Sequence, residues 1–166
     1  MKSFQYLGFW LLLIFVVSGI YSVFDKNKVI GAFASHKSVS NNSDGVVEFI
    51  RASNGHFYIE AIINHKPIIF LVDTGASDLV LSKRDAKKLG ISIKKSGKFK
   101  TYETANGTIR AAVVIIPEVK VGQFIIKNVE ASINLADMQE SLLGMSFLNY
   151  FNFSIKGDRI ILYTRD

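Results

Sequence analysis

A carboxylate, a hydroxyl and a glycine follow one another at the end of a long apolar stretch. Residues Ile68–Val72 are all apolar and lead into Asp73, Thr74, Gly75 and Ala76. Burying a carboxylate beside such a stretch costs free energy unless hydrogen bonds compensate for it. Gly75 lets the backbone turn sharply towards the carboxylate, and the Thr74 hydroxyl can fix the turn. Asp73 is therefore a candidate acid or base; a plain β-turn that uses Asp as a turn former is the alternative interpretation.

A second element that could support this turn follows about 70 residues later. Leu142 and Leu143 are large and apolar, and Gly144 after them allows another chain segment to pass close by. The Leu-Leu-Gly sequence alone carries little information. Its place after Asp-Thr-Gly, with an Asn-Gly hairpin between the two, makes the combination specific. We expect Leu142–Gly144 to pack beneath the Asp73 turn.

The elements that must position these residues are mostly strands. From Val46 onwards, short runs rich in Ile, Val, Phe and Tyr alternate with turn signals, which is typical of an all-β domain. Helices are expected only over Lys83–Leu89, which Gly90 ends, and over Ser146–Tyr150. The expected strands are Val46–Arg51, His56–Ile63, Ile68–Val72, Asp78–Leu81, Phe99–Thr104, Thr108–Ile116, Phe124–Ser132, Asn152–Ile155 and Arg159–Tyr163.

Three short polar segments between these strands predict hairpin turns. Asn64–Pro67 and Lys156–Asp158 each join two expected strands. Asn106-Gly107 is the strongest signal, because both central positions of a type I′ turn need a positive φ. An ordinary surface hairpin is the alternative to a functional one at this place.

The order of these motifs resembles the retropepsin-like aspartic proteases. In that family an apolar strand enters Asp-Thr-Gly-Ala, a flap hairpin follows, and an apolar-apolar-Gly element precedes a short helix. The corresponding segments here are FLVDTGAS, YETANGTIRAA and LLGMSFL, within a match over roughly Val46–Tyr163. With its N-terminal apolar segment, the chain looks most like the membrane-anchored bacterial members of rickettsial type. It departs from viral members at Met145, where they usually carry an Arg that supports the dimer.

The resemblance implies an all-β, retropepsin-like half-barrel with one or two short helices, and an aspartic endopeptidase activity. It implies no cofactor and no metal. The implied site consists of a catalytic Asp73, an active-site turn of Thr74, Gly75 and Ala76, a flap with Asn106 and Gly107, and a support of Leu142, Leu143 and Gly144.

One Asp-Thr-Gly sequence cannot supply the two carboxylates that this chemistry uses. In aspartic proteases, carboxylates about 3 Å apart share one proton, since both cannot ionise together. The ionised member activates a water as base, and the protonated member polarises the scissile carbonyl as acid. The second carboxylate must come from another copy across a twofold axis. No other aspartate is followed by Thr-Gly or Ser-Gly: Asp25, Asp44, Asp78, Asp85, Asp137, Asp158 and Asp166.

The N-terminal segment predicts a membrane anchor. Phe4–Phe24 holds no charged residue, and a helix of that length would cross a hydrocarbon core of about 30 Å. We expect an anchor over 1–24, a flexible linker over 25–45 and the protease domain over 46–166; a cleaved signal peptide is the alternative. Lysines on both sides of the span give no support for an N-terminus-in orientation. The resemblance instead implies a single-pass protein of the bacterial inner membrane with its catalytic domain in the periplasm.

Composition excludes several other functions. The net charge of +6 comes from scattered lysines without a series of stacking aromatics, so no nucleic-acid partner is expected. There is no Cys, and His36, His56 and His65 lack a ligand spacing, which argues against a metal site. The expected partners are a protein or peptide substrate and a second copy of the chain. The rival function is a non-catalytic module of the same fold that holds peptides or a partner at the membrane.

Overall fold

The computed structural model describes residues 45–104 and 107–165 of the 166-residue chain. By its contacts the chain divides into two units, Met1–Ser35 and His36–Asp166, and every described residue belongs to the second. The predicted anchor over 1–24, nearly all of the predicted linker and Asn106 lie outside the described residues. Within the described part, no helix is long and apolar enough to cross a membrane.

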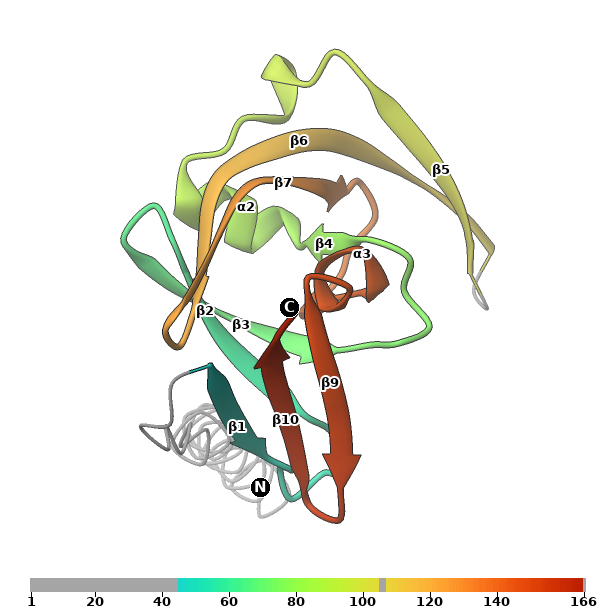
Figure 1. Cartoon of the computed structure of the whole chain (residues 1–166). Coiled ribbons are helices and arrows are strands. Elements are labelled where there is room, and N and C mark those ends of the chain that lie inside the picture. The colour runs from blue at the N-terminus through green and yellow to red at the C-terminus, as the bar shows by residue number, and fades with distance from the viewer. Residues whose placement is uncertain (1–44, 105–106, 166) are drawn as a thin grey trace, which may run out of the picture. The chain divides into compact units, whose positions relative to one another are not determined.

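Seven strands form one curved sheet that closes into a barrel (Figure 1). They are β2 (Tyr58–Ile63), β3 (Lys66–Val72), β4 (Leu79–Leu81), β5 (Phe99–Thr104), β6 (Gly107–Val121), β7 (Phe124–Asn134) and β8 (Ser141–Leu143). Their order in the sheet is β2-β3-β8-β4-β7-β6-β5. The long strand β6 arches over the domain, and Lys120 near its far end pairs with Ile62 of β2. This pairing joins the two sides of the sheet and encloses the core.

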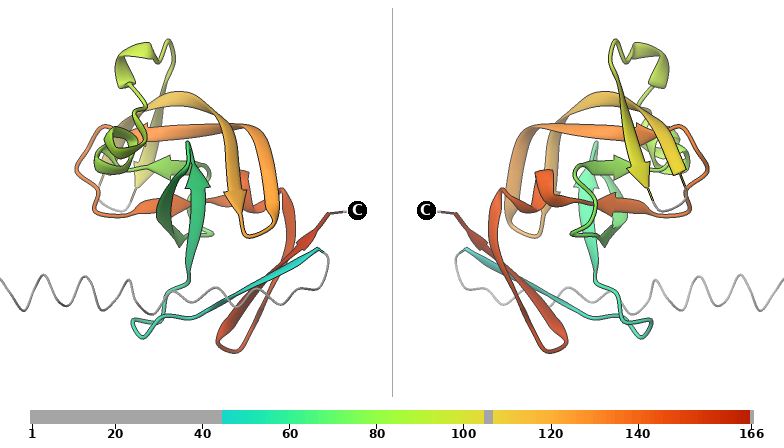
Figure 2. Two further views of the ribbon diagram at one scale, coloured as in Figure 1. Left: turned by 90° about the vertical axis from the view of Figure 1, so that its left-hand side faces the viewer. Right: turned by 90° about the vertical axis from the view of Figure 1, so that its right-hand side faces the viewer.

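A smaller antiparallel sheet lies below the barrel, as the side views of Figure 2 show. Its strands are β1 (Val46–Ile50), β9 (Phe151–Lys156) and β10 (Arg159–Thr164), in the order β1-β10-β9. Phe49 is buried opposite the buried Ile160. Arg159, on the other face of the sheet, donates a hydrogen bond of 2.9 Å to Glu48. The sheet thus buries one apolar face, as the alternation along its strands requires.

The helices are short, and local signals set their ends. Helix α2 (Lys83–Leu89) begins after Ser82, whose side chain accepts a backbone hydrogen bond in the first turn. It ends at Gly90, which adopts a left-handed conformation with φ of 74°. Helix α3 covers Met145–Leu148, and a 3-10 turn, η1, covers Ile93–Lys95. The two predicted helices are confirmed, α2 with its predicted bounds.

The predicted β-rich fold is confirmed, and all nine expected strands are present, β5 with its predicted bounds and the others with shifted ends. The sequence analysis missed β8, because three residues are too few to show a period. It also ended β6 too early, at Ile116. Pro117 lacks an N–H donor, but the β6–β7 ladder resumes beyond it, opposite an irregular Asn128 with φ of 53°.

The hairpin turns follow the predicted chemistry with one correction. Asn64 and His65 join β2 to β3 with φ of 50° and 60°, as a tight hairpin needs. Gly107 also has a positive φ, of 104°. However, Gly107 is paired with Thr104 and is the first residue of strand β6. The prediction that Gly107 is a central residue of the turn was therefore wrong, whereas Asn106 lies outside the described residues.

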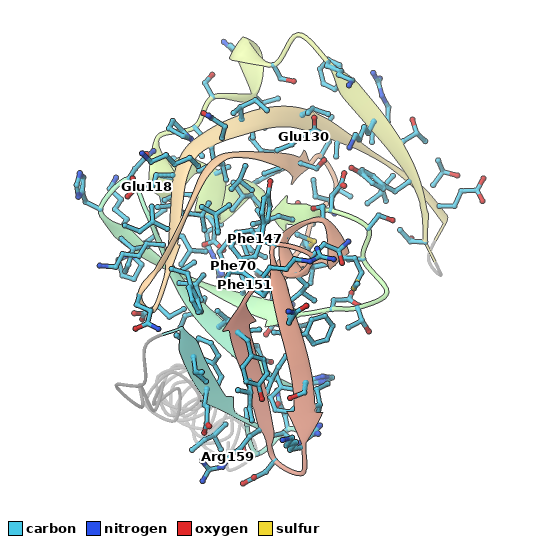
Figure 3. All side chains as sticks on the ribbon, viewed as in Figure 1. Phe70, Glu118, Glu130, Phe147, Phe151 and Arg159 are labelled. Atoms are coloured by element: carbon cyan, nitrogen blue, oxygen red, sulfur yellow. The ribbon has the colours of Figure 1, made fainter. Side chains whose placement is uncertain are left out.

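Aromatic side chains fill the centre of the core (Figure 3). Phe151 lies 5.7 Å from Phe147 and 5.0 Å from Phe124 between ring centroids. Phe70 of β3 and Phe147 of α3 are fully buried. The strand that leads into Asp73 and the helix that follows Gly144 therefore rest on one core, which fixes them relative to each other.

Candidate active site

Strand β8 lies between the two strands that flank the Asp73 loop. It runs parallel to β3, with Val72 opposite Leu143, and antiparallel to β4, with Val80 opposite Leu142. The chain leaves β3, passes through the loop of residues 73–78 and returns as β4. The structure thus places the predicted support directly beside the predicted turn. We call this loop, β8 and the first turn of α3 the floor.

Main-chain groups fix the Asp73 turn. The Asp73 amide donates to the Leu143 carbonyl at 3.2 Å, which ties the turn to β8. The Gly75 amide donates to Asp73 Oδ1 at 2.9 Å, and the Ala76 amide donates to the Asp73 carbonyl at 3.2 Å. Asp73 is half-buried, whereas Thr74 and Gly75 are exposed. The carboxylate is therefore held in one orientation at an accessible turn.

Gly144 is required because the chain crosses the loop at close range. A Cβ added there would lie 2.2 Å from the Asp78 carbonyl oxygen and 2.6 Å from that of Ala76. Just beyond, the Met145 amide donates to the Ala76 carbonyl at 2.8 Å. Ser146 accepts a hydrogen bond of 3.0 Å from the Leu79 amide through its Oγ. The space that glycine leaves thus lets backbone bond to backbone across the floor.

The two leucines of the support differ in burial. Leu143 is fully buried and belongs to the hydrophobic core, whereas Leu142 is half-buried. Because neighbouring residues of a strand point to opposite faces, Leu143 anchors β8 in the core and Leu142 lies on the other face.

The predicted flap is a hairpin whose paired residues extend from Phe99 with Ala112 to Thr104 with Gly107. We call this segment, Phe99–Ala112, the flap hairpin. Among its described residues, none before Ala111 is fully buried. On its outer strand, β5, the Phe99 ring contacts the Arg110 guanidinium at 5.1 Å. The hairpin therefore has little apolar contact that could hold it in place.

A polar cluster that the sequence analysis did not identify joins this hairpin to the floor. The Lys100 ammonium donates to Asp78 Oδ2 at 2.8 Å and to Glu130 Oε1 at 2.7 Å. The Tyr102 hydroxyl donates to the same Asp78 oxygen and lies 2.7 Å from Ser132 Oγ. The five residues come from the loop, from β5 and from β7. We call them the Asp78 cluster.

The cluster shifts the pKa of its members. Partial burial works against ionisation of Asp78, but hydrogen bonds from Lys100 and Tyr102 and the Lys100 charge hold the pKa of this carboxyl below its ordinary value of 3.8. Hydrogen bonds to Asp78 and Glu130 raise the pKa of Lys100 above its ordinary value. Burial, and then the bond to Asp78, raise the pKa of Tyr102. The contacts of the cluster therefore favour an ionised Asp78, a protonated Lys100 and a neutral Tyr102 at the same time.

The described residues hold no group of three or more His, Cys, Asp or Glu side chains that could bind a metal ion. The Asp73 carboxylate at the floor is a group that can hold or release a proton beside a bound water or carbonyl.

Comparisons with known proteins agree with this geometry. A family profile described as "gag-polyprotein putative aspartyl protease" matches residues 59–150, which is more than half of the chain. The chain belongs to this aspartyl protease family. An uncharacterized protein of Rickettsia prowazekii (strain Madrid E) is 44% identical over 119 residues, 71% of this chain and 51% of the relative. An uncharacterized protein of a Sinorhizobium species is 30% identical over 157 residues, 89% of this chain and 67% of the relative.

The fold of this chain matches that of a solved structure. The crystal structure of a retropepsin-like aspartic protease from Rickettsia conorii matches with a TM-score of 0.60 and 40% identity, over 72% of this chain and 90% of that chain. The resemblance inferred from three sequence motifs is confirmed. The chain spans about half the length of the Rickettsia prowazekii relative.

Proposed function

We propose that the chain is an aspartic endopeptidase that works as a homodimer, with Asp73 of each copy as its acid–base residue. The observation that supports this most is the way Asp73 is held. Its amide is bonded to Leu143 of the floor, its carboxylate accepts the Gly75 amide, and the turn around it is exposed. A proton-transfer site requires a carboxylate that is held in one orientation at an accessible position.

The mechanism follows from two such turns that meet across a twofold axis. The paired carboxylates share one proton, because their mutual repulsion opposes ionisation of both. The ionised member takes a proton from water as the water attacks the scissile carbonyl, and the protonated member donates to the carbonyl oxygen. Both pKa values of the pair belong to the dyad rather than to one chain.

The substrate that suits this site is an extended protein or peptide segment. Among the described strands, β5 stands at one end of the sheet order, which is where an extended peptide could be added as a further strand. The flap hairpin would then close over the peptide and exclude water from the dyad.

The experiment that tests the proposal compares the full chain with Asp73→Asn, both purified in mild detergent. Cleavage of a peptide library is measured between pH 4 and 7, with Asp158→Asn as the matched control. Asp158 lies in the exposed β9–β10 turn. We expect Asp73→Asn to abolish cleavage and the control to keep it. Wild-type turnover by Asp73→Asn would contradict the assignment. A wild-type chain that binds peptides but cleaves none would favour the rival binding module.

We also propose, from the sequence of residues 1–24, that the protein is a single-pass protein of the bacterial inner membrane with the described domain in the periplasm. The uncharged stretch Phe4–Phe24 supports the anchor. A reporter fused after Asp166 should be active only in the periplasm, and the protein should stay with membranes after carbonate washing. Activity of the fusion in the cytoplasm alone would invert the topology. A soluble mature protein would indicate a cleaved signal peptide.

A further inference from the structure

Two side chains of the flap hairpin converge on one carboxylate of the active-site loop. Lys100 and Tyr102 are two residues apart on β5, so both side chains point to the same face of the strand. Both donate hydrogen bonds to Oδ2 of Asp78. Asp78 lies in the loop that begins with Asp73. The hairpin is therefore joined to this loop by charged and hydroxyl groups rather than by apolar packing.

The backbone of Asp78 is itself part of the floor. The Asp78 carbonyl oxygen would lie 2.2 Å from a Cβ added at Gly144. The close crossing of these two chain segments therefore sets the position of Asp78. Its side chain is 15% exposed, which is low for a carboxylate at a loop. One residue thus has its backbone fixed in the floor and its side chain bonded to the flap hairpin.

The other side of the cluster lies on β7. Ser132 is fully buried on β7, and its Oγ lies 2.7 Å from the Tyr102 hydroxyl. Glu130, two residues earlier and labelled on β7 in Figure 3, accepts from Lys100 at 2.7 Å. Bonds in such a network strengthen one another, so the loss of one member weakens the rest.

From this geometry we infer that Asp78, Lys100 and Tyr102 are positioning residues, which set the height of the flap hairpin above Asp73 by bonding the base of the hairpin to the active-site loop. The inference rests on the proposed function, because a flap matters only where a peptide is held for cleavage. It assigns no proton transfer to these residues. Their role is to favour the closed arrangement of the hairpin before and during peptide binding.

Hydrogen–deuterium exchange of the full chain in mild detergent tests the contact without relying on activity. In Tyr102→Phe and Asp78→Asn, we expect amides of Phe99–Ala112 to exchange roughly tenfold faster, because a hydrogen bond to a charged group is lost. Amides of the β6–β7 ladder beyond Ala112 should keep their wild-type rates. In peptide cleavage, we expect KM to rise about tenfold while kcat changes less than about threefold, since the flap acts on bound peptide.

Matched variants separate this role from general damage. Tyr58→Phe removes another tyrosine hydroxyl that donates to a carboxylate, that of Glu140, outside the flap hairpin. Asp158→Asn makes the same chemical change as Asp78→Asn on an exposed turn. Both should match the wild type in exchange of the flap hairpin and in KM. Lys100→Arg should have a KM close to that of the wild type, whereas Lys100→Met should have a raised KM.

The outcomes are distinct. Unchanged exchange in the flap hairpin of both Tyr102→Phe and Asp78→Asn, or equal acceleration throughout the domain, overturns the inference. So does a loss of kcat with KM unaltered. If the wild-type chain cleaves no peptide, the proposed function fails. Even then, faster exchange confined to Phe99–Ala112 supports the bond between hairpin and loop, and unchanged exchange overturns it.

Discussion

The floor and the flap hairpin are held by different kinds of contact, although the Asp78 side chain joins them. In the floor, β8 is enclosed by β3 and β4, Leu143 is fully buried, and Gly144 brings two backbone segments together. In the flap hairpin, the described residues before Ala111 are at most half-buried, and the Asp78 cluster joins them to the rest. One region depends on packing and the other on polar side chains.

This difference assigns a separate task to each region. A packed interior has little freedom to move, so the floor can hold Asp73 in one orientation through a reaction cycle. Polar contacts at partly exposed positions are weaker and can break and form again, which a hairpin that admits a peptide needs. The three predictions that follow would weaken or sharpen this contrast, beginning with the largest effect.

Gly144→Ala should damage the floor most. Its Cβ would meet the Asp78 and Ala76 carbonyl oxygens, which are backbone atoms that cannot move aside cheaply. We expect a loss of about 3 kcal/mol or more in the free energy of unfolding, together with loss of cleavage. Chemical denaturation followed by circular dichroism measures it. Gly97→Ala is the control, since a Cβ there meets nothing within 4 Å. A Gly144→Ala protein of wild-type stability would show that the floor is not tightly packed.

Gly107→Ala should affect the flap hairpin with a smaller loss of stability. Space is open around Gly107, but its φ of 104° is unfavourable for alanine. We expect the free energy of unfolding to fall by about 1 kcal/mol, because the strain is confined to one residue at the start of β6. We expect kcat/KM to fall by a larger factor than stability alone explains. A loss of stability as large as that of Gly144→Ala would remove the distinction between the two regions.

The smallest predicted effect is a pH dependence that belongs to the flap hairpin alone. The groups facing the Asp78 carboxylate are Lys100 and Tyr102 of β5 and Ser132 of β7, with Glu130 of β7 beyond Lys100. The pKa of Asp78 lies below its ordinary 3.8 in the folded chain. The contribution of its ionised form is therefore fully present above that value and is lost as pH falls through the lower, folded pKa.

The ratio of kcat/KM between wild type and Asp78→Asn should accordingly stay constant, at no more than about tenfold, from pH 5 to 7. Below its ordinary pKa of 3.8 the ratio should decline towards one as Asp78 is protonated. A ratio that varies between pH 5 and 7 would show that another group controls the flap hairpin.

Much of the floor could be predicted from sequence, because its requirements are local. An apolar run before Asp73, a glycine two residues later and a second glycine after Leu143 each have a steric or hydrogen-bonding reason that shows in the residue types. The Asp78 cluster could not be found in this way. Lys100 was one of the scattered lysines in the sequence, because its partners Asp78 and Glu130 are far away along the chain.

The register of the flap hairpin shows a second limit. Asn106-Gly107 correctly predicted a hairpin, but the pairing of Thr104 with Gly107 places Gly107 in strand β6 rather than in the turn. A turn signal gives the place of a hairpin, whereas its register depends on which strand faces pack against the neighbouring sheet. Strand β8 was missed for a similar reason. Its three residues form a strand because they pair with β3 and β4, which lie far away along the chain.

The central claim is that one chain supplies half of a catalytic site through Asp73. Mixing wild-type chains with a threefold excess of Asp73→Asn chains, with time for subunits to exchange, tests it most directly. If the active unit is a homodimer that needs both carboxylates, cleavage per wild-type chain should fall to about one quarter of its value without the variant, as random pairing requires. Adding the same excess of Asp158→Asn chains should raise total cleavage instead. Undiminished cleavage per wild-type chain in the Asp73→Asn mixture, with subunit exchange shown by labelled chains, would contradict the account.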